Sequence, residues 1–249
     1  IEAVQKLLGM GMQELVLDLR NNPGGYLGAA INISNEFLED NLLIVYTQDR
    51  SGNKEEYFSN RKGLLINTQV IVIIDEGSAS ASEIVAGALQ DNDKGTIVGR
   101  RSFGKGLVQE QFEHHDGSAY RITTQRYYTP TGRCIQRPYA KGQGKDYASD
   151  LLQRINTGEL LSRDSIVFDD SLKFVTAKGK IVYGGGGIMP DIFIPLDTKS
   201  YHSSISEAVR KDLIRQFAFD YTNKYREELE RQSLSNFIAL FEFNANDYN

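Results

Sequence analysis

Short apolar runs alternate with stretches of helical periodicity along the first part of the chain. Apolar or β-branched composition predicts strands at Glu14–Leu19, Leu42–Thr47, Glu55–Ser59, Gln69–Ile74 and Thr96–Gly99. Helical spacing predicts helices at Leu27–Leu38 and Ser82–Asp91. The continuous β-branched run Gln69–Ile74 is typical of a strand that is buried on both faces. Strands that alternate with helices predict a layered α/β domain with a largely parallel sheet.

The rest of the chain changes character several times. Residues Leu107–Tyr128 have the pattern of paired strands joined by a turn at His115–Gly117. From about residue 140 to 182 the composition is polar with few periodic signals, which indicates an insertion or a peripheral subdomain. A last strand is expected at Ile192–Pro195. Helical spacing then dominates Ser203–Phe243. We therefore expect a core over residues 1–199 and a helical extension over residues 200–249.

Composition excludes several classes of function. The 249 residues carry a formal net charge of -5, and an acidic chain argues against nucleic acid as a partner. The sequence has no apolar run of about 18 residues, so no transmembrane segment is expected. One cysteine, Cys134, excludes an internal disulfide framework and a Cys-rich zinc site. His114 and His115 are neighbours that point to opposite faces of a strand, and we expect no metal site.

A serine-rich segment stands between an expected buried strand and a helix. It reads Gly77-Ser-Ala-Ser-Ala-Ser-Glu83. A nucleophile at this place would project from the end of the sheet, and N–H groups at the helix start would stabilise an oxyanion. The alternative is a helix cap, in which Ser78, Ser80 or Ser82 accepts a backbone hydrogen bond.

A lysine lies between two glycines just after the strand at Thr96–Gly99, in Ser102-Phe-Gly-Lys-Gly106. Desolvation in a tight turn favours the neutral amine, so Lys105 would be able to accept a serine proton. The alternative is an ordinary lysine in a surface turn. A phosphate-binding loop is excluded, because Gly106 rather than Ser or Thr follows Lys105.

A glycine turn ends the first expected strand, in Leu19-Arg-Asn-Asn-Pro-Gly-Gly25. Ligands of α/β sheets bind beyond the carboxyl ends of the strands. An N–H group of Gly24 or Gly25 would therefore be placed to serve as a second oxyanion donor, unless the turn is a plain chain reversal.

Four motifs occur in order: Asp18-Leu-Arg-Asn-Asn-Pro-Gly-Gly25, Gly77-Ser-Ala-Ser-Ala-Ser-Glu83, Phe103-Gly-Lys-Gly-x-Val-Gln109 and Tyr128-Thr-Pro-Thr-Gly-Arg133. Together they resemble the carboxyl-terminal processing proteases, or tail-specific proteases, of the S41 serine peptidase family. The resemblance is close from Glu14 to Gln136 and resumes at Gly184–Asp191.

The resemblance implies a crotonase-like core and a serine–lysine dyad that needs no cofactor. The family's spacing selects Ser80 as nucleophile, because it stands 25 positions before Lys105, the general base. Gln109 matches the glutamine that orients the lysine. Ala81 matches one oxyanion donor, and Gly24 or Gly25 matches the other.

The resemblance also has implications for the substrates, the cellular location and the neighbouring domains. Substrates would be the C-terminal tails of proteins, and the location would be the periplasm or cell envelope of a bacterium. Family members carry a PDZ-like domain that this sequence lacks. Because the chain opens with Ile1 inside an expected helix, we expect a fragment or processed form with that domain upstream. The helical extension from Ser200 would be a packing helix or a docking element for a homo-oligomer.

Two other readings stay open. A crotonase-like thioester enzyme would use the same oxyanion chemistry, although carboxylates would be expected in place of Ser80 and Lys105. A binding or scaffolding module would hold peptide tails without turnover. A Ser-His-Asp hydrolase is disfavoured, because His114, His115 and His202 stand in no recognisable motif.

Overall fold

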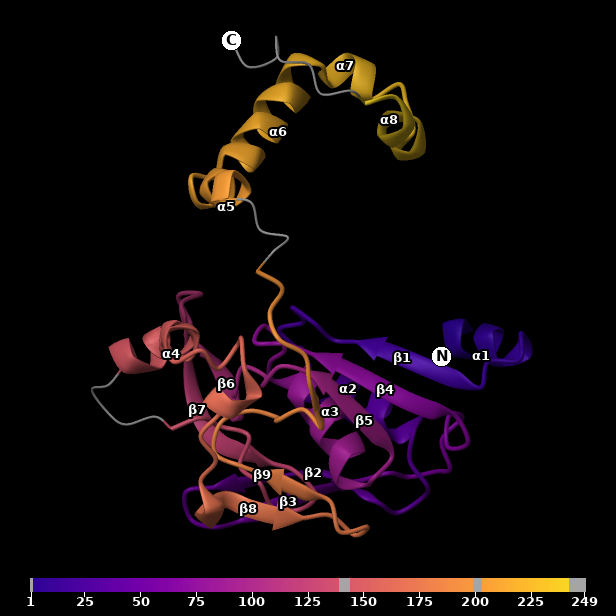
Figure 1. Ribbon diagram of the computed structural model, residues 1–249, viewed down its shortest axis with the longest axis vertical. Coiled ribbons are helices and arrows are strands. Elements are labelled where there is room, and N and C mark those ends of the chain that lie inside the picture. Colours follow the sequence, from indigo (N-terminus) through magenta and orange to yellow (C-terminus); the bar gives the residue numbers. More distant parts are fainter. Residues whose placement is uncertain (1, 139–143, 199–202, 242–249) are drawn as a thin grey trace. The chain divides into compact units, whose positions relative to one another are not determined.

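The computed structural model describes residues 2–138, 144–198 and 203–241 (Figure 1). The chain forms two compact units, Ile1–Leu196 and Asp197–Asn249. His202 lies outside the described residues.

A four-stranded parallel sheet forms one layer of the first unit. Its strand order is β1 (Glu14–Asp18), β4 (Gln69–Ile74), β5 (Gly95–Gly99) and β10 (Ile192–Phe193), and every neighbouring pair is parallel. The helices α2 (Leu27–Asn35) and α3 (Ala81–Asp91) follow β1 and β4 and pack together. Every residue of α3 is buried. The prediction of a layered α/β domain with a parallel sheet is confirmed.

The prediction that β4 is buried on both faces is wrong for the described residues. Val70, Val72 and Ile74 are at most 4% exposed, whereas Ile71 is 42% exposed. Successive side chains of a strand point to opposite faces. The apolar core therefore covers one face of β4, and the other face meets solvent.

A second, antiparallel sheet provides the strand that follows Lys105. Its order is β3 (Lys54–Phe58), β2 (Leu43–Asp49), β7 (Ala119–Tyr128) and β6 (Leu107–Glu113). The expected hairpin of β6 and β7 is present, and its turn is closed by a hydrogen bond from His114 N–H to Ser118 O at 2.8 Å. His114 and His115 are exposed at this end.

The polar segment contains more regular structure than its composition predicts. It forms α4 (Gly144–Asn156), two short 3₁₀ helices (Arg163–Ser165 and Asp170–Leu172), and the hairpin of β8 (Lys173–Val175) and β9 (Ile181–Tyr183). The helix α4 was not predicted from the sequence, because this segment is polar and shows few periodic signals. At the start of the chain, α1 (Glu2–Gly9) confirms the expected first helix.

The second unit is helical, as expected, but its helix is interrupted. It consists of α5 (Ser203–Arg210), α6 (Leu213–Lys224), α7 (Arg226–Leu229) and α8 (Leu234–Leu240). Asp212 has a φ of 59°, which ends the first helical segment. Aromatic rings join α6 to α8 and the residue after it: the ring centroid of Tyr221 lies 6.4 Å from that of Phe237 and 5.5 Å from that of Phe241.

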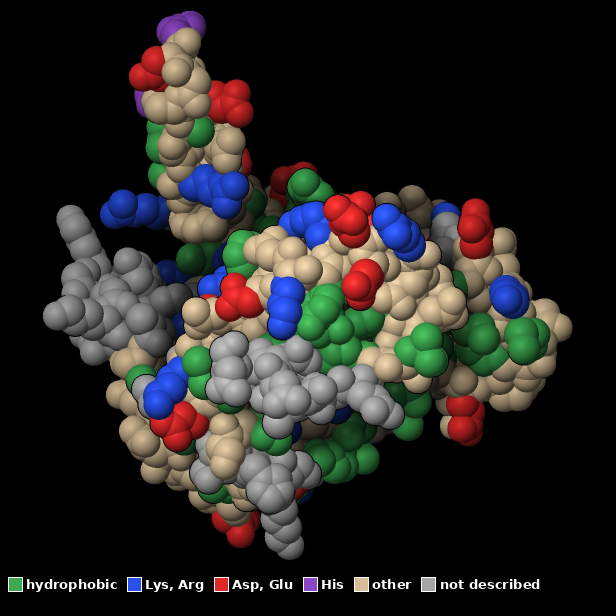
Figure 2. Space-filling view, turned by 90° about the horizontal axis from the view of Figure 1, so that it is seen from above, with side chains coloured by type: hydrophobic (Ala, Val, Ile, Leu, Met, Phe, Trp, Pro, Cys, Tyr) green, Lys and Arg blue, Asp and Glu red, His purple; other side chains and the backbone are tan. Residues whose placement is uncertain are grey.

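Charged side chains of both signs lie on the surface. Figure 2 shows acidic and basic side chains interspersed among polar and apolar ones. Over the ranges that the structure describes, none of the helices combines the length and apolar character that a bilayer crossing requires.

Candidate active site

Ser80 lies at a sharp turn between β4 and α3. Its backbone has φ 56° and ψ −115°, a conformation that residues with side chains rarely adopt. Ser80 is partly exposed, whereas Ser78 is completely buried and Ser82 is 4% exposed. Of the three serines in this segment, Ser80 is therefore the one that a substrate would reach.

The flanking serines hold this turn against the segment that follows β1. The Ser78 hydroxyl donates to Leu19 O at 2.7 Å, and the Ser82 hydroxyl donates to Asn22 O at 3.1 Å. The N–H group of Ala79 also donates to Asn22 O, at 3.0 Å. Ser78 and Ser82 thus have structural partners, which explains why serines flank the candidate nucleophile.

Gly24 lies directly against the Ser80 turn. It has a φ of +88°, and a Cβ atom placed on it would lie 2.5 Å from Ala79 O and 2.6 Å from Ala81 N. Both the backbone angle and the close approach require glycine at this position. The glycine turn is therefore part of the site and not a plain chain reversal.

The buried carboxylate of Glu83 joins the serine turn to the segment that carries the lysine. Its Oε2 accepts hydrogen bonds from the N–H groups of Ser80 and Lys105, each at 2.8 Å. Its Oε1 accepts from the Ser102 hydroxyl at 2.5 Å and from Gly104 N–H at 2.7 Å. Because one oxygen atom binds both backbone nitrogens, the candidate nucleophile and base are held in adjacent segments.

Glu83 is completely buried among these donors. Burial raises the pKa of its carboxyl, and the four hydrogen bonds that it accepts act in the opposite direction. Glu83 is not among the site residues predicted from the sequence. The available signal was its position three residues after Ser80, which is the spacing of a helix capping box.

Lys105 is partly buried between Gly104 and Gly106, immediately before β6. Its side chain forms no ion pair or hydrogen bond with another described residue. Gln109 is exposed on β6 opposite Thr123, just beyond a register shift between β6 and β7. The structure places Gln109 on the strand that Lys105 precedes, but no hydrogen bond joins their side chains.

The candidate oxyanion donors surround Ser80. Ala81 is the first residue of α3, so its N–H group belongs to the free N-terminal end of that helix. The N–H group of Gly24 donates to Asn22 Oδ1 at 3.0 Å. Gly25 is exposed beside it. Since Gly24 N–H already has an acceptor, Gly25 is the better candidate of the two glycines.

A small apolar cavity of about 180 Å³ adjoins these donors. Gly24, Gly25 and Ala81 form part of its wall. Further apolar lining comes from β1, the residue after it, α2 and α3, namely Leu17, Leu19, Ala29, Ala30, Ile33 and Val85. The cavity has the size and polarity to accept one apolar side chain beside the serine.

Comparison with known proteins identifies the family. The family model described as Peptidase family S41 matches residues 1–146. The chain belongs to peptidase family S41. A carboxyl-terminal-processing protease from Synechocystis sp. is 44% identical to this S41 chain over 135 residues, which is 54% of this chain and 31% of the relative. The chloroplastic carboxyl-terminal-processing peptidase 3 of Arabidopsis thaliana is 40% identical over 173 residues, 66% of this chain and 33% of the relative.

A solved structure supports the same conclusion for the fold. The photosystem II D1 C-terminal processing protease aligns with a TM-score of 0.55 and 28% sequence identity, covering 78% of this chain and 38% of that one. The S41 chain therefore spans about a third of the length of the relatives that it matches.

Proposed function

We propose that this S41 chain is the catalytic part of a serine endopeptidase that uses Ser80 as nucleophile and Lys105 as general base. The observation that best supports the proposal is the shared oxygen of Glu83, which accepts hydrogen bonds from both residues' backbone N–H groups. The exposure of Ser80 beside buried Ser78 and Ser82 supports the choice of serine.

The proposed chemistry is acyl transfer through a covalent ester. The neutral Lys105 amine takes the Ser80 hydroxyl proton while Oγ bonds to the scissile carbonyl carbon. The C–N bond then breaks, and Lys105 returns the proton to the leaving amine. Water hydrolyses the ester with Lys105 again acting as base, which regenerates the Ser80 hydroxyl. No step requires a metal or an organic cofactor.

Backbone donors and one side chain complete the proposed machinery. The N–H groups of Ala81 and Gly25 would bind the oxyanion, and such a donor is typically worth about 3 kcal/mol. Gln109 would orient the Lys105 amine after a local adjustment at the start of β6.

The substrates that we propose are C-terminal tails of proteins with an apolar residue at the cleaved bond. The relatives' names, which describe carboxyl-terminal processing, and the apolar cavity beside Ala81 support this choice. Relatives come from bacteria and from chloroplasts, and we propose a periplasmic or cell-envelope location for this chain. Self-association through residues 200–249 is part of the proposal and is measurable by light scattering.

Cleavage of fluorogenic peptides with apolar C-terminal tails tests the proposed function. Ser80→Ala and Lys105→Ala should each lower kcat by at least about a thousandfold without changing the circular dichroism spectrum. Ser51→Ala and Lys62→Ala, which alter exposed residues of the same types, should cleave normally. Full activity of pure Ser80→Ala protein would refute the mechanism. Tight peptide binding by the wild-type chain without any cleavage would favour the binding module instead.

A further inference from the structure

Lys105 belongs to an irregular segment whose donors bind a carboxylate and whose carbonyl groups bind arginines. In this lysine segment (residues 101–105), hydrogen-bond donors face the Glu83 carboxylate, as described above. The carbonyl groups of the same segment face arginines. Arg154 donates from Nη2 to Arg101 O at 2.6 Å and from Nη1 to Ser102 O at 3.2 Å. Arg137 donates from Nη1 to Phe103 O at 3.3 Å.

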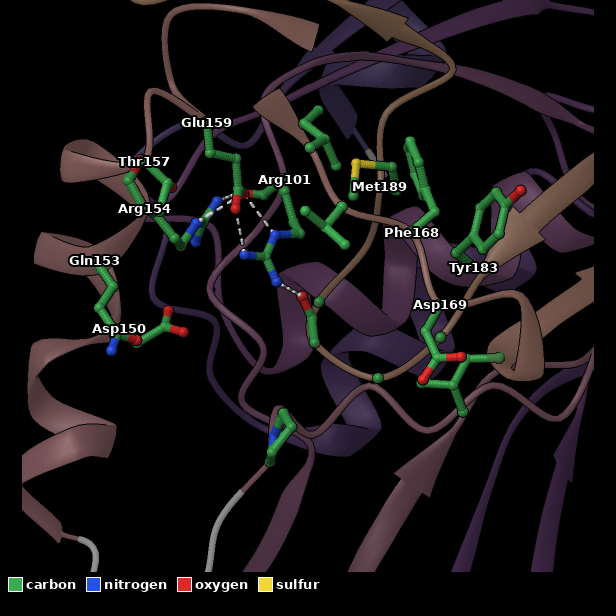
Figure 3. A pocket seen from close by; sticks show the side chains of 18 of the residues that line it. Arg101, Asp150, Gln153, Arg154, Thr157, Glu159, Phe168, Asp169, Tyr183 and Met189 are labelled. Atoms are coloured by element: carbon green, nitrogen blue, oxygen red, sulfur yellow. Dashed lines mark hydrogen bonds and ion pairs between the residues drawn. The ribbon is translucent and has the colours of Figure 1, made fainter. Parts of the chain in front are cut away.

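The guanidinium of Arg154 is itself fixed. Arg154 stands in the last turn of α4, and its side chain is 4% exposed. Its Nε donates to Glu159 Oε1 at 2.9 Å, and the same carboxylate binds Arg101 through two hydrogen bonds of 2.7 Å. Figure 3 shows Glu159 between the two arginines at the wall of a cavity of about 520 Å³.

These contacts indicate that Arg101, Arg154 and Glu159 support the lysine segment. They do not indicate that the cavity is a ligand site. Arg101 directs its remaining guanidinium nitrogen to Gly186 O at 3.0 Å. All three nitrogens of Arg154 donate to protein oxygens. Because the guanidinium groups of Arg101 and Arg154 already bind protein oxygens, an anionic ligand in the cavity would have to break existing ion pairs.

We propose that Arg154 is a positioning residue for Lys105. It fixes the two successive carbonyls at the start of the lysine segment while Glu83 fixes the N–H groups at its end. This proposal rests on the proposed function, in which Lys105 is the general base. A planar guanidinium is able to bind two carbonyls and a carboxylate at once, which an ammonium group cannot do with the same geometry.

The expected size of the effect follows from the geometry that catalysis requires. A displacement of about 1 Å in a reacting group costs up to roughly 100-fold in rate. Substrate binding would change much less, because the cavity beside Ala81 is lined by β1, α2 and α3 rather than by α4. Loss of Arg154 should therefore act on kcat and not on KM.

Two variants of the full chain test the proposal. Arg154→Lys keeps the charge beside Glu159, and Arg154→Met removes it while Glu159 keeps its ion pair with Arg101, so that no charge is left buried alone. Lys180→Met, which breaks a separate ion pair with Asp191, is the matched control. The measurements are kcat and KM for a fluorogenic peptide, and hydrogen exchange at the amides of the lysine segment.

We expect kcat to fall about 10-fold in Arg154→Lys and about 100-fold in Arg154→Met, with KM within about threefold of wild type. The Gly104 and Lys105 amides should exchange faster in both, and the control should match wild type. Wild-type kcat and wild-type exchange in folded Arg154→Lys would overturn the proposal, as would a rise in KM with unchanged kcat.

A parallel Lys105→Ala measurement separates the two proposals. If Lys105→Ala cleaves like wild type, the proposed function fails, and the exchange data alone decide whether Arg154 holds the segment. If Lys105→Ala is inactive while Arg154→Lys has normal kcat and normal exchange, the positioning proposal alone fails.

Discussion

Replacement of Glu83 by glutamine perturbs the carboxylate whose two oxygen atoms accept four hydrogen bonds in the candidate site. The amide keeps one oxygen acceptor and replaces the other with an NH₂ group. If the NH₂ group faced Ser80 and Lys105, two buried N–H donors would lose their acceptor. The less costly orientation directs it toward Ser102, whose hydroxyl oxygen is able to accept, and leaves Gly104 N–H unpaired.

The cost of this orientation has three parts. An unpaired buried N–H group at Gly104 costs about 1–3 kcal/mol. The bonds from Ser80 and Lys105 change from charge-assisted to neutral, which weakens each by about 1 kcal/mol. Removal of a buried charge offsets part of this loss. We therefore expect the free energy of unfolding to fall by about 3 kcal/mol.

Urea unfolding at pH 7 measures this change, with an unchanged m-value as the sign that the unfolded state is unaltered. Glu36→Gln is the control. The Glu36 side chain is largely buried, as that of Glu83 is, with 10% of it exposed. Its ion-pair partner Arg61 is 54% exposed, so Glu36→Gln should lower the free energy of unfolding by less than about 1 kcal/mol. The kcat of Glu83→Gln should also fall by about 10-fold or more. A loss of stability below about 0.5 kcal/mol with normal kcat would refute the role that we give to Glu83.

Two further substitutions test other parts of the structure. Gly24→Ala should destabilise the chain by at least about 2 kcal/mol and depress cleavage, because of the positive φ and the contact with Ala79 O. Gly28→Ala, in an open position of α2, should instead be neutral or stabilising in the same unfolding experiment. Burial opposes ionisation of Glu159, but its arginine partners outweigh burial and lower its pKa below the ordinary 4.5. Its stabilisation is therefore present above about pH 4.5 and is lost as pH falls, so the difference in unfolding free energy between wild type and Glu159→Gln should shrink between pH 7 and pH 3.

The sequence predicted the parts of the fold that depend on local pattern. Strand periodicity located β1, β4 and β5, and the turn chemistry of Gly24 and Gly25 located the loop beside the serine. Contacts between distant segments carry no such pattern. The bond from Lys105 N–H to Glu83 spans 22 positions, and the bond from Arg154 to Arg101 O spans 53. Neither pairing follows from helical or strand spacing, because each depends on where separate loops meet.

The exposed face of β4 shows a second limit of prediction from sequence, which concerns burial. A run of β-branched residues reports that a strand is apolar on both sides, but it does not report whether a layer covers each side. The described residues cover only the face of Val70, Val72 and Ile74. Composition therefore predicted the strand correctly and its surroundings incorrectly.

Some of the residues that hold the segment of the candidate base Lys105 lie beyond the part of the chain that identifies the family. The family match covers residues 1–146 and contains Ser80, Glu83 and Lys105. Arg154 and Glu159 follow that range, yet they bind the carbonyl side of the lysine segment. A carboxylate only accepts hydrogen bonds, so Glu83 is able to fix the N–H groups of the lysine segment but not its carbonyl groups. The carbonyl groups need a hydrogen-bond donor, and Arg154 of α4 supplies it to two of them. The polar segment after residue 140, which composition alone describes as peripheral, is on this argument a structural condition for placing Lys105.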